Sequence, residues 1–226
     1  MGKEQLIPNF ELIKSKKEIE WNNKEKEVEG WGDKLGRGID EKIKNIVVAF
    51  DMIGLPTSSS CEGHLDHGYS APWIGIKAPN EPAERFIDQD KIFQKIADEY
   101  NLSLDDMGHK ENREIYFKAF DEFEKNGETL EFQQWRQKNQ ELIRRASELL
   151  NKFYKERKVL KNIKLGIIEY AEGEFRIYNG GEDYHPITEE KFEKLTEEQK
   201  NELSQRLKQY QNEMKEFAKF LKEKIF

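Results

Sequence analysis

The chain has 226 residues, of which 37% are charged and 36% hydrophobic, and its formal net charge is −7. Its 14 Phe, 8 Tyr and 4 Trp supply large apolar side chains for a core, which disfavours a disordered chain. A single cysteine excludes an intramolecular disulfide, and the longest apolar run, residues 46–50, is far too short to cross a membrane. We therefore expect a folded, soluble, cytoplasmic protein with no membrane partner.

The first predicted element is a helix over residues 40–53, where apolar side chains recur every three or four positions. Asp40 stands where an N-cap residue is expected, and Gly54 followed by Pro56 marks the end of the helix. The apolar stripe consists of Ile43, Ile46, Val47, Phe50 and Ile53. Such a stripe is typical of a helix that packs one face against a core.

Two predicted strands, residues 57–64 and 72–77, follow this helix. A hairpin of two more strands, residues 165–170 and 174–179, comes much later and flanks a short turn that contains a glycine. The long stretch between the two strand pairs has helical patterns. It contains three predicted helices, at residues 83–100, 110–126 and 129–158.

The chain ends in a predicted amphipathic helix, which opens at Thr196 with the capping-box pattern T-E-E-Q. Its apolar seam consists of Leu203, Leu207, Tyr210, Met214, Phe217 and Leu221. Such a seam packs on the body of its own chain or pairs with a helix of another protein. We favour packing within the chain, because the seam covers less than three heptads and a domain of this size needs core area.

These elements predict an α+β fold, in which a small antiparallel sheet is covered by helices. Residues 31–80 and 163–187 would form a discontinuous α/β core. Residues 81–162 would be a long helical excursion, and residues 188–226 would contain the C-terminal helix. We expect these parts to make one compact domain.

Residues 57–67 contain most of the side chains that suit a functional site. The only cysteine, Cys61, and two of the four histidines, His64 and His67, have the spacing C-x₂-H-x₂-H. One hypothesis is a zinc or iron site formed by these three residues, with His185 as a remote fourth ligand. A second is a nucleophile–base pair of Cys61 and His64.

A pocket for an anion or a cofactor is a third hypothesis for the same segment. Ser59, Ser60 and the Gly63 amide would hold the ligand, and His64 would serve as an acid–base group or an anion contact. A simpler interpretation competes with all three hypotheses. In it, Cys61 is a small buried hydrophobic residue and both histidines lie in a loop.

Three short motifs occur in order near this segment: Asp33-Lys34, then Gly38-Ile39-Asp40, then Thr57-Ser58-Ser59-Ser60-Cys61-Glu62-Gly63-His64. Together they resemble the opening of the wybutosine-synthesising tRNA methyltransferase family, which has a D/K segment, a G-x-(I/V)-D helix start and a T-S-S-C-S-G-R strand. The positions that match the family are Asp40, Ser59, Ser60, Cys61 and Gly63. Glu62 and His64 stand where the family has Ser and Arg.

The resemblance implies an α/β core that binds S-adenosylmethionine and acts on RNA. Our leading hypothesis is therefore a nucleotide- or RNA-handling enzyme that resembles a tRNA-modifying methyltransferase. Its ligand contacts would be Ser59, Ser60, Gly63 and Asp40, and its catalytic candidates are Cys61 and His64. One alternative is a metal-dependent hydrolase that uses Cys61, His64, His67 and His185. The other is a non-enzymatic module that binds another protein, for example through its C-terminal helix.

Charge is distributed unevenly along the chain. Residues 81–132 contain fifteen acidic and seven basic side chains, whereas residues 136–164 contain three acidic and ten basic ones. The basic block would contact the phosphate backbone of RNA, with Lys155, Lys158 and Lys161 as candidate contacts. The competing interpretation is a solvated helix face, in which Glu141 pairs with Arg145 and Glu148 with Lys152.

Overall fold

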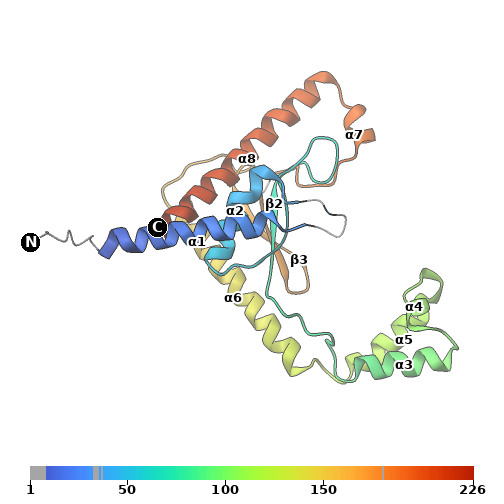
Figure 1. Cartoon of the computed structure of the whole chain (residues 1–226). Coiled ribbons are helices and arrows are strands. Elements are labelled where there is room, and N and C mark those ends of the chain that lie inside the picture. Colours follow the sequence, from blue (N-terminus) through green and yellow to red (C-terminus); the bar gives the residue numbers. More distant parts are fainter. Residues whose placement is uncertain (1–8, 33–35, 37, 180) are drawn as a thin grey trace, which may run out of the picture. The chain divides into compact units, whose positions relative to one another are not determined.

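The computed structural model describes residues 9–32, 36, 38–179 and 181–226, and side chains from residue 16 onward within these ranges. Its contacts divide the chain into two compact units (Figure 1). The sheet unit comprises Met1–Lys77 and Leu142–Phe226, and the helical unit comprises Ala78–Glu141. The helical unit is shorter than the predicted excursion, because α6 (Leu130–Phe153) begins in the helical unit and ends in the sheet unit.

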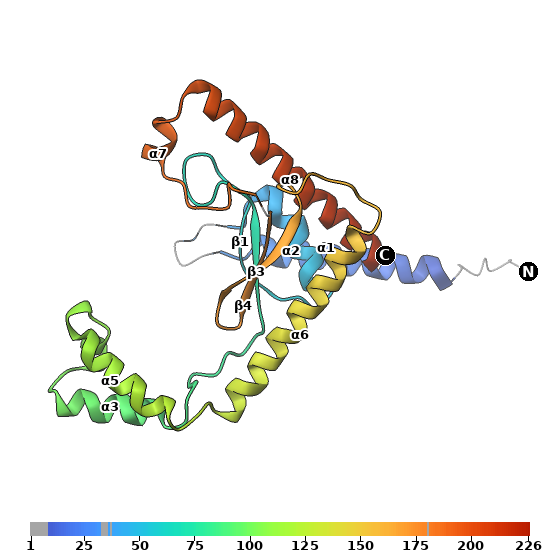
Figure 2. The ribbon, with the colours of Figure 1, turned by 180° about the vertical axis from the view of Figure 1, so that it is seen from behind.

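The sheet unit is built on a four-stranded antiparallel sheet with the order β1-β2-β4-β3. Figure 2 labels β1, β3 and β4 of this sheet. Its strands are β1 (Thr57–Cys61), β2 (Trp73–Lys77), β3 (Leu165–Ala171) and β4 (Glu174–Asn179). The predicted α+β class and all four strands are therefore confirmed. Strand β1 ends three residues earlier than predicted. Gly63 adopts a positive φ of 82°, and the next residue turns back to donate its backbone N–H to the Tyr69 carbonyl.

One face of this sheet carries the core. The register places Ile74 opposite Ile177 and Ile76 opposite Phe175, and all four side chains are fully buried. Helices α2 (Glu41–Met52) and α8 (Glu197–Ile225) pack together on this side. The rings of Phe50 on α2 and Phe217 on α8 meet edge to face, 5.8 Å between centroids. Burying side chains of this size stabilises a fold by roughly 1.5–3 kcal/mol each.

Helix α8 confirms the predicted C-terminal helix and its position within the fold. The Thr196 hydroxyl accepts a hydrogen bond from the Gln199 amide, and the Gln199 side chain accepts one from the Thr196 amide, as a capping box requires. All six seam residues are buried. The seam is thus packed within the chain, so it does not present a free apolar face to another protein. A short helix, α7 (Glu189–Glu193), precedes α8.

Helix α1 (Asn9–Glu29) has no counterpart among the predicted elements. Its sequence is rich in charged residues and has no continuous apolar stripe, so periodicity gives little signal. It packs against α2, with Trp21 and Val28 buried. No helix in the described ranges is long and apolar enough to cross a membrane.

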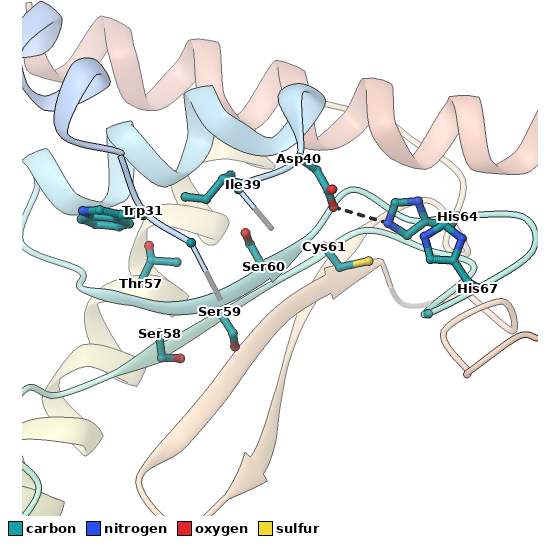
Figure 3. Close-up of a pocket in the computed structure, with 13 residues that line it drawn as sticks. Trp31, Ile39, Asp40, Thr57, Ser58, Ser59, Ser60, Cys61, His64 and His67 are labelled. Atoms are coloured by element: carbon teal, nitrogen blue, oxygen red, sulfur yellow. Dashed lines mark ion pairs between the residues drawn. The ribbon is translucent and has the colours of Figure 1, made fainter. Parts of the chain in front are cut away.

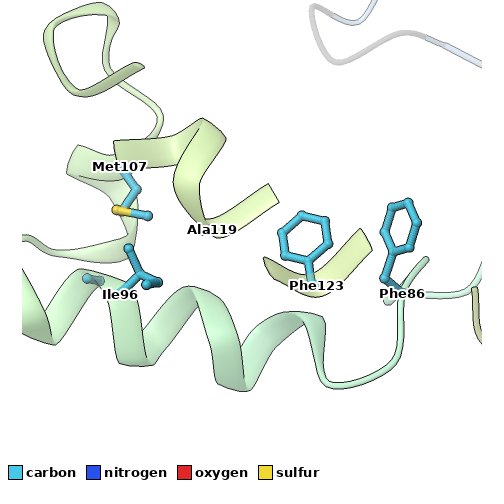
Figure 4. Packing of buried hydrophobic residues seen from close by; sticks show 6 residues of the cluster. Phe86, Ile96, Met107, Ala119 and Phe123 are labelled. Carbon is cyan, nitrogen blue, oxygen red and sulfur yellow. The ribbon is translucent and has the colours of Figure 1, made fainter. Parts of the chain in front are cut away.

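The helical unit contains α3 (Gln89–Glu99), α4 (Leu104–Met107), the 3₁₀ helix η1 (Lys110–Asn112), α5 (Arg113–Glu124) and the first part of α6. Helix α3 starts later than predicted, because Asp88 before it takes the left-handed conformation. The unit has a small core of its own (Figure 4). The buried residues of this core are Phe86, Ile96, Ala97, Met107, Ala119 and Phe123.

Candidate functional site

A cavity of about 410 Å³ opens between the edge strand β1 and the segment that leads into α2 (Figure 3). The lining residues are Trp31, Gly32, Gly38, Ile39, Asp40, Thr57, Ser58, Ser59, Ser60, Cys61, His64, His67 and Gly68. The lining therefore includes most of the candidate residues that the sequence indicates. Asp33 and Lys34, which belong to the family resemblance, lie outside the described residues.

A β-bulge at the start of β1 directs the hydroxyl groups of this strand to two sides. The register places Thr57 opposite Ile76 and Ser60 opposite Ile74, so both face the helix side of the sheet. Ser59 lies opposite Gly75 and faces the other side. The Thr57 hydroxyl is buried without a hydrogen-bond partner, which makes it a further candidate ligand contact that the sequence analysis did not single out.

Two hydrogen bonds between backbone amides and carboxylates link the start of α2 to the end of β1. Asp40 makes no side-chain cap, contrary to the expectation from sequence. Its Oδ2 instead accepts the backbone N–H of Glu62 at 3.0 Å, while a Glu62 carboxylate oxygen accepts the Lys42 N–H at 3.0 Å. Glu62, 22 positions away in sequence from Asp40, thus satisfies one of the free amides of α2. In this arrangement the Asp40 carboxylate is directed toward the cavity.

Asp40, Cys61 and His64 converge at one end of the cavity. Their potential ligand atoms all lie within 4.8 Å of one another. His64 Nε2 is 3.4 Å from Asp40 Oδ2. Two ligands bound to zinc at about 2.0 Å in tetrahedral geometry are separated by about 3.3 Å, so this spacing suits a shared metal ion.

The environment of Cys61 favours an acceptor role for its sulfur. The side chain is 8% exposed, and the Gly63 backbone N–H donates to Sγ at 3.4 Å. Burial raises the pKa of the Cys61 thiol, and the negative charges of Asp40 and Glu62 add to this increase, whereas amide hydrogen bonds from Gly63 and Tyr69 oppose it. The raised pKa favours the neutral thiol, whereas a cation at this point would favour the thiolate, which is the form that binds a metal.

The other two histidines of the predicted metal site do not join this group. The ring of His67 stacks on that of His64, with centroids 4.0 Å apart and planes 22° from parallel, and its Nδ1 is 2.6 Å from Asp66 Oδ1. His185 is exposed, and its Nδ1 lies 2.8 Å from the Glu182 carbonyl. Within the part of the chain that the structure describes, the structure brings Cys61 and His64 together with Asp40 instead.

Gly63 serves the packing of the loop. Its amide already donates to Cys61, so it is not free to hold a ligand. A Cβ atom at this position would lie 2.7 Å from Leu207 Cδ1 of α8 and 3.0 Å from the Ala71 backbone. Glycine is needed here because the backbone has a positive φ and touches α8 directly.

The basic block predicted between residues 136 and 164 serves two roles in the structure. Arg145 donates to the carbonyls of Ile53 and Gly54 at the C-terminal end of α2, and Arg144 pairs with Glu148. Arg145 is thus a packing residue rather than part of a solvated face. The three lysines proposed as RNA contacts are exposed on the connection between α6 and β3: Lys155, Lys158 and Lys161.

Comparison of the chain with protein-family models, with curated proteins and with solved structures finds no match. The resemblance of residues 33–64 to the tRNA methyltransferase family therefore stays a prediction.

Proposed function

We propose that the protein is a metal-dependent hydrolase with a zinc-type ion bound by Asp40, Cys61 and His64. The observation that carries this proposal is the convergence of one oxygen, one nitrogen and one sulfur ligand at the end of an open cavity. Three protein ligands with a fourth position left to water or substrate are typical of catalytic zinc sites. A metal ion at such a site activates water for attack at neutral pH.

The surrounding residues hold these ligands in place, as the outer shell of a metal site does. The Glu62 amide fixes one carboxylate oxygen of Asp40, and the Gly63 amide donates to the sulfur of Cys61. Stacking by His67 restrains the ring of His64. Thr57 and Ser60 also line the cavity from β1, and their hydroxyl groups would contact a bound substrate.

Metal analysis of protein purified without chelators tests the proposal. We expect one zinc-type ion per chain, and we expect Asp40→Asn, Cys61→Ser and His64→Ala each to lower its occupancy strongly. The loss of the ion should also lower the thermal stability, because metal binding is coupled to folding. His185→Ala is the matched control, since that side chain lies outside the group, and it should keep the ion.

The His67→Ala variant separates this geometry from the C-x₂-H-x₂-H set. A stacking role predicts that most of the metal is retained, whereas a ligand role predicts a loss as large as that of His64→Ala. Full metal content in all three ligand variants, or no metal in the unmodified protein after incubation with zinc, would rule out the site.

RNA modification with S-adenosylmethionine is a second candidate function. It is favoured by the exposure of Lys155, Lys158 and Lys161 on one connection of the sheet unit. RNA affinity should then fall steeply with added salt, and charge reversal at the three lysines should weaken it. A thermal shift caused by S-adenosylmethionine would support the cofactor. If RNA does not bind at low salt, this candidate fails while the metal site is unaffected.

A further inference from the structure

Arg176 on β4 is a cation buried among aromatic rings. The residue is 6% exposed. The guanidinium carbon lies 3.7 Å from the ring centroid of Trp73 and 3.2 Å from that of Tyr170, so the group is flanked by two rings. Its Nη1 is 3.3 Å from the Tyr184 hydroxyl. These contacts fix the position of the guanidinium, but they do not provide a hydrogen-bond acceptor for every one of its N–H donors.

Two N–H donors at this position are buried without a hydrogen-bond partner. They are Nε of Arg176 and Nε1 of Trp73, whose side chain is 8% exposed. The carboxylate of Glu174 lies 3.8 Å from Arg176 Nε, which is too far for a hydrogen bond. A buried unpaired donor destabilises a fold, and native proteins rarely leave one unless a water, an ion or a ligand satisfies it.

The two donors lie on the same face of the sheet. Gly75 on β2 is paired with Arg176, and Trp73 is two residues away on the same strand, so both side chains point to the side opposite the helices. Gly75 contributes no side chain between them. Three polar atoms instead surround the point where a Gly75 Cβ would lie: the hydroxyl oxygens of Ser59 at 2.6 Å and Ser58 at 2.9 Å, and Glu174 Oε1 at 3.1 Å.

We propose that Arg176 and Trp73 form a subsite for an oxyanion, a phosphate or a carboxylate group carried by a ligand of this protein. The guanidinium supplies the positive charge and one charge-assisted hydrogen bond, and the indole N–H supplies a second donor. The rings of Tyr170 and Trp73 hold the guanidinium in a fixed plane. This inference does not depend on a metal ion at Asp40, Cys61 and His64.

Titration of the full chain with inorganic phosphate, in the presence of a chelator, tests the subsite. The ¹H–¹⁵N resonance of the Trp73 indole, assigned with Trp73→Phe, should shift downfield and saturate. The Trp135 indole is an internal reference that should not move, because its N–H already donates to the Ala78 carbonyl. A parallel titration with acetate distinguishes a phosphate subsite from a carboxylate subsite, because the anion of the preferred class should bind more tightly.

Three variants sharpen the test. In each variant, anion binding is followed by the resonances of the backbone amides of β2 and β4. Arg176→Gln should weaken the binding by about tenfold or more, since it removes the charge. Trp73→Phe keeps a ring against the guanidinium but removes one donor, so it should weaken binding by a smaller factor. Glu174→Gln should strengthen binding, because it removes the nearest negative charge.

Several results would overturn the proposal. One is a Trp73 indole that does not respond to either anion, which means that a water molecule satisfies the donors. Another is an equal response in folded Arg176→Gln. If Arg176→Gln does not fold, the decision rests on the other two variants, and unchanged affinity in both Trp73→Phe and Glu174→Gln overturns the subsite.

Discussion

The sheet unit and the helical unit differ in how they distribute charge and buried polar groups. Residues 78–141 contain sixteen acidic and nine basic side chains, whereas the rest of the chain contains 29 of each, so the helical unit accounts for the whole net charge of −7. Several large apolar side chains of the helical unit are exposed: Ile87, Tyr100, Leu104, Tyr116, Phe117 and Leu130. Among the described residues, the helical unit buries one amide side chain, that of Asn139, whereas the sheet unit buries four charged or amide side chains: Arg176, Asn179, Asp183 and Glu213.

This difference follows from the size of the two cores. Burying a polar or charged group costs free energy unless it is paired, and only a large apolar core offsets that cost. Among the described residues, the helical unit buries nine apolar residues, whereas the sheet unit buries thirty, in α1, α2, α6, α8, the sheet and its loops. The candidate metal site and the Arg176 subsite therefore both belong to the unit that can support them.

The largest expected effect is the unfolding of the helical unit while the sheet unit stays folded. Phe123→Ala removes a ring that contacts three other aromatic rings, and it should cost about 3–5 kcal/mol. A cost of this size is comparable to the whole stability of a small domain. We expect the amides of α3 and α5 to lose protection from hydrogen exchange, while those of β2 and β4 keep it.

Phe217→Ala in the sheet unit is the matched control, and it should have the opposite pattern. Loss of protection in both units of either variant would show that the chain unfolds as one cooperative domain, as the sequence analysis expects. The two units would then differ in composition but not in stability.

The next effect concerns Asp183, whose carboxylate accepts two hydrogen bonds from Arg206 and one from Tyr210. Burial opposes its ionisation, but the bonds from Arg206 and Tyr210 outweigh this and lower the pKa of Asp183. Since breaking a buried ion pair on one side is strongly destabilising, Asp183→Asn should cost about 3 kcal/mol at pH 7. Urea unfolding of the sheet unit measures this difference.

The sign of the pH dependence follows from the lowered pKa. The carboxylate stabilises the folded state fully above the ordinary Asp pKa of about 3.9, and this contribution is lost as the pH falls through the lower folded value. The gap between the unmodified protein and Asp183→Asn should thus be constant near neutral pH and narrow below about pH 4. A gap that widens in acid would contradict this assignment.

A smaller effect is expected from the two capping boxes, one in each unit. The Thr196 hydroxyl caps the 29-residue α8, and the Ser103 hydroxyl caps the four-residue α4. Each substitution by alanine should cost about 1 kcal/mol. If the units are independent, Thr196→Ala lowers hydrogen-exchange protection only in the sheet unit, and Ser103→Ala only in the helical unit. If either substitution lowers protection in the other unit as well, the two units unfold cooperatively.

The smallest effect is the response to salt. Like charges repel in the acidic helical unit, and salt screens that repulsion. Raising the ionic strength should stabilise the helical unit by less than about 1 kcal/mol and leave the neutral sheet unit nearly unchanged. Hydrogen exchange of the amides in each unit, measured at low and at high sodium chloride concentration, compares the stability of the two units. Equal responses would mean that local ion pairs, rather than net charge, govern the helical unit.

Much of the fold is determined locally and is therefore visible in the sequence. The stripe of residues 40–53, the hairpin around Gly173 and the capping box at Thr196 each depend on neighbours within a few positions. These elements form where they were predicted. Helix α1 was missed because its sequence has almost no apolar periodicity, and its position depends on contacts with α2.

The site itself was decided by tertiary structure. The sequence places Cys61 and His64 three positions apart, but only the fold brings Asp40 beside them, where its carboxylate accepts the backbone N–H of Glu62, 22 positions away. Likewise, Arg176 meets Trp73 through strand pairing between β2 and β4, which no local pattern encodes. Periodicity reports which face of an element is apolar. The approach of polar groups from distant elements depends on the packing of the whole unit, and that packing determined where chemistry becomes possible.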